Sequence, residues 1–237
     1  MKLYNDDCYN VIENLESGSV DMILTDPPYE IENQGGGLMN STCRVFLKEI
    51  NDMGMCKTEF DPKDFLPKTV RLFKSKEHYN AIYFCSRLQV ADYLNFAIEE
   101  EFQYGIMFWH KTDPPPLCNN KYLNDIELIV YIKGKKSKIY GDYSTKSLVY
   151  TSGINRKDKD NWDHPTIKPL ELINKFVINH TKENEVVFDP FMGSGTTGVS
   201  CKILNRDFIG VEKTEKYYRV AKKRIRTEQR EDLDSIF

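Results

Sequence analysis

A short apolar run that ends at two consecutive prolines constrains this chain more than any other feature. Residues 20–24 (VDMIL) are typical of a buried strand, and Thr25-Asp26-Pro27-Pro28-Tyr29 follow directly. Each proline fixes φ and removes a backbone donor, so the strand cannot continue. The chain must turn at the carboxyl end of the strand, where open α/β sheets bind ligands. We expect a binding site there, and an ordinary turn with a locally packed tyrosine is the alternative.

A second motif lies far downstream and joins a strand to a helix through glycines. Gly193, Gly195 and Gly198 fit the pattern G-x-G-x-x-G after an expected strand at 186–188, and Glu212 ends the next strand. Glycines let the backbone approach a ligand, and a carboxylate at this place accepts hydrogen bonds from ribose hydroxyls. The motif therefore predicts a nucleotide-ribose pocket, with a plain tight turn as the alternative.

The ligand of this pocket is indicated by an acid beside the glycine turn. A helix N-terminus favours anions such as pyrophosphate, but Asp189 lies close to that position. An acid suits a cationic or amine-bearing ligand, and S-adenosylmethionine carries a sulfonium and an α-amino group. Only 25 residues follow Glu212, so most strands must come from upstream, in a circularly permuted order relative to dinucleotide-binding folds.

Strands that alternate with helices predict the fold class. We expect one α/β, Rossmann-like domain over residues 1–237, with a mostly parallel seven-stranded sheet. Two strands in succession after a helix at 88–101 predict one antiparallel member. Residues 30–60 are irregular, and they are either a segment that closes over a substrate or a surface insertion. The expected strands are 2–4, 20–24, 80–85, 102–110, 125–132, 186–188 and 208–211, and the expected helices are 8–15, 65–73, 88–101, 166–181, 197–204 and 215–226.

Composition excludes several classes of protein. The chain is 40% hydrophobic and 29% charged, as globular proteins are, and no run approaches the roughly 20 apolar residues of a membrane span. Six cysteines without CxxC spacing and four histidines predict neither a zinc site nor a disulfide framework, so no metal is expected. Free thiols indicate a reducing, cytoplasmic location. A net charge of −3 means that any basic, nucleic-acid-binding surface must be local.

Taken together, the motifs and their order resemble the β-class amino-group DNA methyltransferases, in which the catalytic motif precedes the glycine motif. The resemblance spans nearly the whole chain and is strongest to the small adenine methyltransferases of bacterial restriction-modification systems. This chain has Asp6 and Ile167 where the family often has Gly and Gln. The matching stretches are Asp26-Pro27-Pro28-Tyr29, His164-Pro165-Thr166-Ile167-Lys168-Pro169, Asp189-Pro190-Phe191-Met192-Gly193-Ser194-Gly195-Thr196-Thr197, Asp7-Cys8, Trp109-His110-Lys111 and Glu127.

The resemblance implies transfer of a methyl group from S-adenosylmethionine to the N6 amino group of adenine in a flipped-out nucleotide. The implied catalytic residues are Asp26 and the Pro27 carbonyl as hydrogen-bond acceptors, Pro28 as the rigid part of the turn, and Tyr29 as a stacking surface. Phe191 is either a second wall for the base or packing for the turn. The implied cofactor-binding residues are Asp7, Cys8, Asp26, His164, Thr166, Lys168, Asp189, Pro190, Phe191, Gly193, Ser194, Gly195, Thr196, Thr197 and Glu212.

A DNA-recognition region is expected at residues 103–163. Residues 103–168 contain eleven Lys or Arg against seven Asp or Glu, a local charge of +4, although such runs are often just solvated surface. The basic residues 222–226 are interpreted as a solvated face at a helix C-terminus, and Thr166 as the N-cap of the helix at 166–181. The candidate DNA-binding residues are Lys111, Lys133, Lys135, Lys136, Arg156 and Lys157.

Other classes of function stay open at this point. A dehydrogenase does not explain residues 26–29, and a non-catalytic binding subunit should have lost one of the two motifs. An N4-cytosine DNA methyltransferase, an RNA methyltransferase and an enzyme that methylates protein glutamine are further alternatives. Double-stranded DNA is the expected partner, no membrane association is expected, and a homodimer and a cognate restriction endonuclease are candidate partners.

Overall fold

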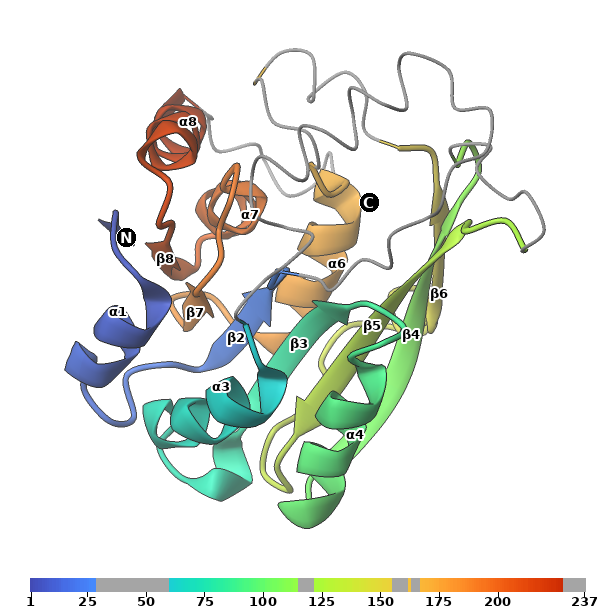
Figure 1. Ribbon diagram of the computed structural model, residues 1–237, viewed down its shortest axis with the longest axis horizontal. Helices are drawn as coiled ribbons and strands as arrows, with labels where there is room; N and C mark the ends of the chain where they lie inside the picture. Colours follow the sequence, from blue (N-terminus) through green and yellow to red (C-terminus); the bar gives the residue numbers. More distant parts are fainter. Residues whose placement is uncertain (29–59, 115–121, 155–161, 163–166, 228–237) are drawn as a thin grey trace.

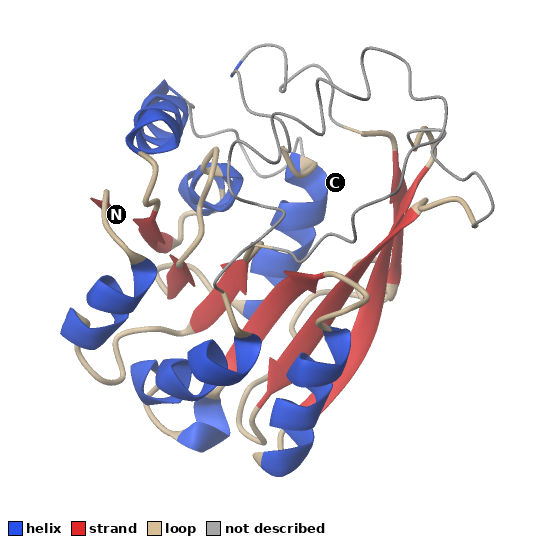
Figure 2. Ribbon diagram, in the orientation of Figure 1, coloured by secondary structure: helices blue, strands red, loops and turns tan. Residues whose placement is uncertain are grey.

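In a computed structural model, the described residues are 1–28, 60–114, 122–154, 162 and 167–227. They form one eight-stranded sheet with the order β1-β8-β7-β2-β3-β5-β4-β6 (Figure 2). Five residues with predicted roles lie outside the described part, namely Tyr29, Arg156, Lys157, His164 and Thr166, and so does most of the irregular segment at 30–60. The strands are β1 (Lys2–Tyr4), β2 (Met22–Thr25), β3 (Asn80–Cys85), β4 (Gln103–Lys111), β5 (Ile126–Lys133), β6 (Val149–Ser152), β7 (Val186–Asp189) and β8 (Asp207–Val211).

Seven of these eight strands run in the same direction. Strand β5 is antiparallel to both of its neighbours, β3 and β4, whereas β6 pairs in parallel with β4. The prediction of a mostly parallel sheet with one antiparallel strand is therefore confirmed. The sheet has one strand more than the seven expected, because β6 adds to its edge. Strand β6 is four residues long and partly exposed, so its sequence carries no apolar run.

Helices cover both faces of the sheet (Figure 1). One hydrophobic core lies between the sheet and α1, α3 and α4, and the other lies between the sheet and α6, α7 and α8. Because both faces are covered, the central strands are apolar on both sides, which explains their unbroken hydrophobic runs. The helices are α1 (Cys8–Asn14), α3 (Pro62–Thr69), α4 (Val90–Glu99), α6 (Leu170–His180), α7 (Thr196–Ile203) and α8 (Glu215–Thr227).

Helix α6 begins later than expected, and this corrects one prediction. It starts at Leu170 with Pro169 as its N-cap residue, and no side chain caps it. Pro169 has a ψ of 131°, outside the helical range, so the helix begins only after it. Proline also disfavours helical backbone angles in the residue before it, here residue 168. Thr166 is therefore not the N-cap, and Lys168 lies on the segment that enters the helix. No helix in the described ranges has the length and apolar content that a bilayer crossing requires.

Strands β2 and β7 bring the two sequence motifs together. They pair in parallel, with Met22 opposite Val187 and Ile23 opposite Phe188. Both strands therefore end at the same edge of the sheet, and each is followed directly by its motif. With both sheet faces filled by helices, this edge is where the described fold leaves room for a ligand.

Candidate active site

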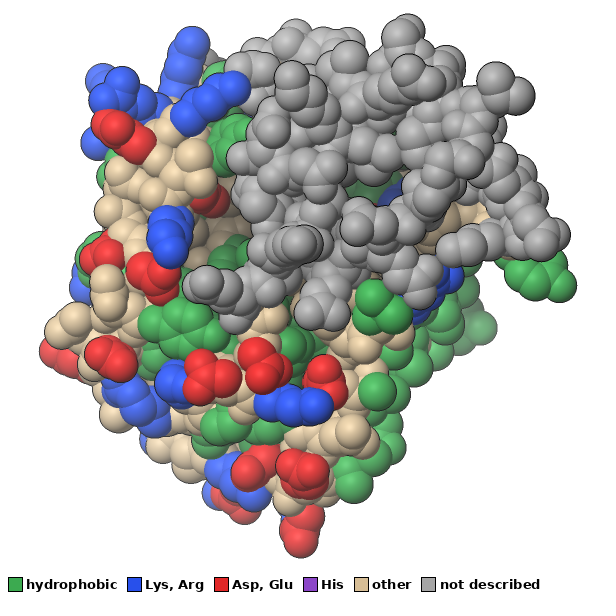
Figure 3. All heavy atoms as spheres, in the orientation of Figure 1, with side chains coloured by type: hydrophobic (Ala, Val, Ile, Leu, Met, Phe, Trp, Pro, Cys, Tyr) green, Lys and Arg blue, Asp and Glu red, His purple; other side chains and the backbone are tan. Residues whose placement is uncertain are grey.

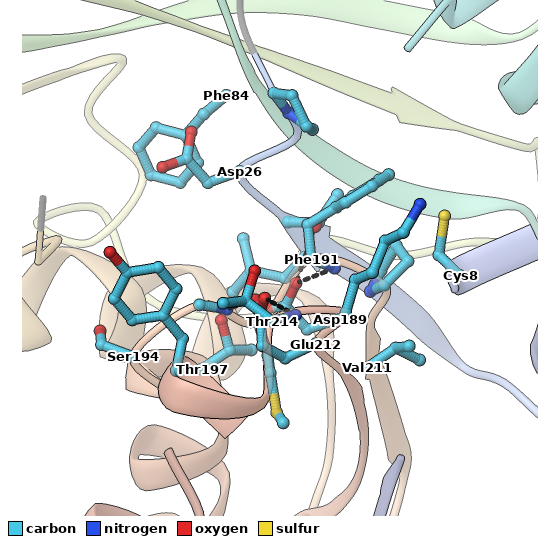
Figure 4. Close-up of a pocket in the computed structure, with 18 of the residues that line it drawn as sticks. Cys8, Asp26, Phe84, Asp189, Phe191, Ser194, Thr197, Val211, Glu212 and Thr214 are labelled. Carbon is cyan, nitrogen blue, oxygen red and sulfur yellow. Dashed lines mark hydrogen bonds between the residues drawn. The ribbon is translucent and has the colours of Figure 1, made fainter. Parts of the chain in front are cut away.

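A cavity of about 620 Å³ lies at the carboxyl edge of the central strands. Most residues predicted for the site line it, although they come from distant parts of the chain. In Figure 4, Asp26 and Phe84 lie toward one end of the cavity and Glu212 and Thr214 toward the other. Pro27 is buried and Gly195 lies in the turn, and neither is among the lining residues. The predicted residues that line the cavity are Asp7, Cys8, Asp26, Pro28, Lys168, Asp189, Pro190, Phe191, Gly193, Ser194, Thr196, Thr197 and Glu212.

A hydrogen bond joins the two motifs directly. The buried hydroxyl of Thr25 donates to Asp189 Oδ1 at 2.7 Å, across 164 residues of sequence. Thr25 is the last residue of β2 and Asp189 is the last residue of β7. The bond fixes the ends of the two neighbouring strands against each other, and the Asp26 carboxylate follows one residue later. No local pattern marks Thr25 as a site residue, because its partner is so distant in sequence.

The Asp189 carboxyl is poised to change its charge near neutral pH. Burial raises its pKa to about 7, although hydrogen bonds from Thr25, Thr197 and the Phe191 backbone N–H lower it. The negative charge of Asp26 raises the pKa further. A buried acid with this pKa favours a cationic or amine-bearing ligand, because such a ligand stabilises the ionised carboxylate.

Glu212 at the end of β8 bridges the glycine turn and the start of α8. Its carboxylate accepts the backbone N–H groups of Gly193 at 3.1 Å and Thr214 at 2.7 Å. Burial raises the pKa of Glu212 above its ordinary value. The Glu212 carboxylate lines the cavity while these N–H bonds restrain it, which suits an acceptor for ribose hydroxyls.

Glycine is needed in the turn for close packing as well as for backbone shape. Gly195 has φ of +80°, a conformation that favours glycine, and it is the N-cap of α7. A Cβ atom at Gly198 would lie 2.4 Å from Ile225 Cδ1 and 2.7 Å from Phe208 Cε1. The last glycine of the motif therefore lets α7 pack against α8 and β8.

Arg224 on α8 also holds the glycine turn, contrary to its interpretation as a solvated cation. Its side chain is buried, with 3% of its surface exposed, and Nη1 donates to Thr196 Oγ1 at 2.8 Å and to Ser194 Oγ at 3.2 Å. Lys222, Lys223 and Arg226 are exposed as expected, and Lys and Arg side chains gather over α8 in Figure 3. Arg224 differs because it lies one helical turn after Ala221, on the face that α8 turns toward the core.

Asp7 and Cys8, at the start of α1, form another wall of the cavity. Asp7 is the N-cap and accepts the Tyr9 N–H at 3.0 Å, and its other oxygen pairs with Lys213 Nζ at 3.0 Å. Burial raises the pKa of the Cys8 thiol to about 12, so the thiol is neutral and inert at physiological pH. This wall offers a planar ligand one apolar and one polar surface.

Phe191 packs against neighbouring rings and also lines the cavity, while its role as a wall for the base stays a prediction. Its ring lies 5.2 Å from that of Phe60 and 5.5 Å from that of Phe65, in edge-on and tilted arrangements. These contacts hold the ring in place beside Asp189. The aromatic cluster also connects the glycine turn to α3.

The turn at residues 26–28 is held from two sides. On one side, Gln89 is buried before α4 and its Nε2 donates to the Pro28 carbonyl at 3.2 Å, while its Oε1 accepts from Ser86 at 3.0 Å. On the other side, Lys168 Nζ lies 2.7 Å from Asp26 Oδ2. Gln89 gave no signal in the sequence, because its only link to the site is a contact across the fold.

The predicted DNA-binding lysines divide between the two ends of the sheet. Lys133 pairs in register with Asn80, the first residue of β3, and Lys135 and Lys136 follow it. Because β5 is antiparallel, they lie at the opposite end of the sheet from Asp26, and the rise from Leu128 to Lys133 alone is about 16 Å. Lys111 does lie at the site edge, but it pairs with Glu127 at 2.7 Å. The structure therefore does not bring Lys133, Lys135 and Lys136 to the cavity.

The fold and this cavity define an α/β protein with an acidic nucleotide-type pocket next to a rigid Asp-Pro-Pro turn. A sequence model of the N6/N4 methyltransferase family, described as DNA methylases, matches residues 20–223. The chain therefore belongs to the N6/N4 DNA methylase family.

Known relatives agree with this assignment. The chain is 32% identical to the type II methyltransferase M2.LlaDCHI of Lactococcus lactis subsp. cremoris, over 94% of this chain and 88% of that protein. It is also 32% identical to the type II methyltransferase M2.DpnII of Streptococcus pneumoniae, over 96% and 90% of the two chains. Among solved structures, the M1.HpyAVI–SAM complex is similar with a TM-score of 0.67 and 28% identity, over 94% of this chain and 98% of that one.

Proposed function

We propose that this protein is a site-specific DNA methyltransferase that transfers a methyl group from S-adenosylmethionine to the N6 amino group of adenine in a flipped-out nucleotide. The observation that carries the proposal is that Asp26 and the glycine turn line one cavity. The cavity thus holds an acceptor for an amino group, Asp26, next to a pocket that suits a nucleoside cofactor. The type II methyltransferases among the relatives support the same reaction class.

The residues around the glycine turn fit S-adenosylmethionine. The buried Asp189 suits the cationic and amine-bearing end of the cofactor, and Glu212 suits its ribose hydroxyls. Asp7 and Cys8 supply a wall for the adenine ring, and Ser194, Thr196 and Thr197 supply hydroxyls. When bound, the cofactor supplies an electrophilic methyl group on its sulfonium.

The Asp26 turn would raise the reactivity of the target amino group by hydrogen bonding. The lone pair of an exocyclic amino group is delocalised into the base, so the group is a weak nucleophile. The Asp26 carboxylate and the Pro27 carbonyl each accept one N–H, which directs the lone pair away from the ring. The work before transfer is positioning and electrostatics, not proton removal by a strong base, and the nitrogen releases its surplus proton after the methyl group is attached. The double proline and Gln89 keep the turn rigid, and Tyr29 is proposed to stack on the extruded base at ~1–3 kcal/mol.

Substitution of Asp26 tests this proposal. We expect Asp26→Ala to abolish methyl transfer and to change the cofactor Kd by less than about tenfold, or ~1.4 kcal/mol, because the acceptor is lost and the pocket is kept. The assay is transfer of labelled methyl groups to unmethylated DNA, followed by nucleoside analysis. Glu99→Ala is the control, since Glu99 is an exposed acid on α4 away from the cavity.

The same assay separates the alternatives. Labelled N4-methylcytosine in the wild-type product would contradict the adenine assignment, and methylation of RNA alone would contradict the DNA assignment. Full activity of Asp26→Ala would remove the proposed mechanism. Asp26, where some family members have Ser, is the feature that favours adenine over cytosine.

We also propose that the protein acts in the cytoplasm, recognises DNA through residues of the 103–163 region other than Lys133, Lys135 and Lys136, and works beside a cognate restriction endonuclease. The type II names of its relatives support the nuclease partner, and co-expression with such a nuclease in a host that lacks the methylation would test protection. A homodimer stays a prediction, and light scattering of the purified protein would measure it.

A further inference from the structure

Four charged side chains form a row that ends at the proposed acceptor. Lys111 Nζ lies 2.7 Å from Glu127 Oε2, Glu127 Oε1 lies 2.5 Å from Lys168 Nζ, and Lys168 Nζ lies 2.7 Å from Asp26 Oδ2. The four groups come from four segments: the end of β4, the start of β5, the entry to α6 and the turn after β2. Their signs alternate and sum to zero at neutral pH.

The row is shielded from water, so holding its charges there costs desolvation free energy. The side chains of Lys168 and Glu127 are only 11% and 12% exposed, and those of Lys111 and Asp26 are 18% and 25% exposed. Removing charges from water costs several kcal/mol per ion, and an apolar replacement is often as stable. A buried ionic row is therefore weak evidence for a stabilising role, and its position at Asp26 suggests a role in the reaction.

The two central groups of the row, Glu127 and Lys168, stay ionised at physiological pH. Burial opposes the ionisation of Glu127, but Lys168 and Lys111 outweigh it and lower the pKa of Glu127 to about 2. Burial likewise opposes the charge of Lys168, and Asp26 and Glu127 outweigh it and raise the pKa of Lys168 above its usual range. The Lys168 ammonium also lies 4.7 Å from the centre of the Phe84 ring, and the ring shields the ammonium from water on that side.

We infer that Lys168 is a positioning residue that sets the direction and acceptor strength of the Asp26 carboxylate, and that Glu127 holds Lys168 in that role. The inference rests on the proposed function. By binding one carboxylate oxygen, Lys168 favours the charged form of Asp26 and limits its rotation. Because Glu127 shares the ammonium, Asp26 is not fully neutralised and can still accept an N–H from the base. Lys111 anchors the far oxygen of Glu127.

This role differs from the one that the resemblance implies for Lys168, a contact with the cofactor. A cofactor contact predicts a loss of cofactor affinity when Lys168 is replaced. A positioning role predicts a loss in the methyl-transfer step with affinity kept. The two roles therefore separate in a comparison of rate with binding.

Three variants of the row test the inference in single-turnover assays. We expect Lys168→Met to lower the methyl-transfer rate at least ~30-fold and to change the Kd values for S-adenosylmethionine and for DNA less than ~3-fold. Lys168→Arg keeps the charge and should recover the rate to within ~5-fold of wild type. Glu127→Gln has nearly the same shape as Glu127 and should lower the rate ~10-fold. Lys76→Met is the control, because it also breaks a 2.7 Å ion pair, the one between Lys76 and Glu100. Lys76 precedes β3 and so lies at the other end of the sheet from Asp26.

Two outcomes of these assays would contradict the inference. A cofactor Kd that weakens as much as the rate falls would assign Lys168 to the cofactor. Wild-type rates in Lys168→Met and Glu127→Gln would make the row structural, and circular dichroism checks that each variant is folded. If Lys168→Met does not fold, the near-isosteric Glu127→Gln decides the question alone. A wild-type protein that methylates DNA at cytosine defeats the adenine proposal but leaves this test intact, whereas one without methyl transfer defeats both.

Discussion

Asp189 is the residue whose charge we expect cofactor binding to change. Its pKa of about 7 lies above the ordinary carboxyl value because of burial, so near pH 6.5 much of it carries a proton. The unfolded chain has already lost that proton above pH ~4, so this group makes the folded state less stable as pH rises from ~4 to ~7. A cationic ligand favours the ionised form and lowers the pKa again.

S-adenosylmethionine binding should therefore release protons in the window around pH 7. We expect roughly half a proton or more released at pH 6.5, almost none at pH 8.5, and a Kd that tightens several-fold between pH 6 and pH 8. Calorimetric titration in buffers of different ionisation enthalpy measures this directly. Asp189→Asn should remove the buffer dependence, which separates Asp189 from Glu212. A binding enthalpy that is independent of buffer at every pH would count against the role of Asp189.

Residues whose chemistry follows from their neighbours in sequence were predictable, and residues that act through distant contacts were not. Asp26, Asp189 and Glu212 stand at strand ends within recognisable turns, and the structure places all three in one cavity. Thr25, Gln89 and Arg224 hold those turns through partners 28 to 164 residues away. Their side chains are common in turns and helices, so no spacing in the sequence distinguishes them.

At the scale of elements, α8 is the support of the glycine turn. Ala221 and Ile225 fill the space that glycine leaves at positions 195 and 198, and Arg224 bonds the two hydroxyls of the turn. The helix is strongly polar on its outer face, so its sequence alone suggested a solvated surface element. The burial of Arg224 shows that one face of α8 belongs to the site.

Loss of the Arg224 contacts should loosen the turn. We expect Arg224→Met to lower the free energy of unfolding by ~1–3 kcal/mol, because two buried hydroxyls lose a charged donor. The cofactor Kd should weaken at least ~10-fold, since the turn forms the cofactor pocket. Urea unfolding and equilibrium binding provide the two measurements.

Arg226→Met is the matched control on the same helix. Arg226 is exposed, so its replacement should change stability by less than about 0.5 kcal/mol and leave cofactor binding intact. Equal behaviour of the two variants would show that Arg224 does not support the turn.

Secondary structure was predictable where packing on both sheet faces makes a strand apolar. The central strands and the described helices other than α6 are expected close to the observed places. Strand β6 is not predictable because an edge strand needs no apolar run. Helix α6 begins later than its apolar pattern predicts, because the backbone of Pro169 is itself non-helical. The sequence predicts one antiparallel strand without saying which, and the structure shows that it is β5, so the lysines at the end of β5 lie away from the cavity.

At the scale of the whole molecule, the antiparallel direction of β5 places the predicted DNA-binding lysines at two ends of the sheet. Lys111 lies at the cavity edge, and Lys133 lies at the opposite edge. The carboxyl edge holds the cavity, so DNA must approach there for a base to reach Asp26. Lys135 and Lys136 lie at the other end, and Lys136 pairs with Glu77. Arg156 and Lys157 fall outside the described residues, and they stay predicted DNA contacts on the basis of sequence.

Paired substitutions test this division. Arg156→Ala combined with Lys157→Ala should weaken DNA binding and lower the slope of log affinity against log salt by up to about 2, because two phosphate contacts are lost. Lys135→Ala combined with Lys136→Ala should change neither. Titration of labelled DNA at several salt concentrations gives both slopes. A larger loss in the second pair would place the DNA at the opposite end of the sheet.

The pairing of β2 with β7 has a wider consequence. The spacing between Asp26, the proposed amino-group acceptor, and the proposed cofactor pocket is set by main-chain hydrogen bonds between adjacent strands, with Ile23 opposite Phe188. Backbone spacing does not depend on which side chains a lineage keeps. Relatives that differ from this chain at about two positions in three can therefore keep the same distance between the two strand ends, because that distance does not rest on the side chains that changed.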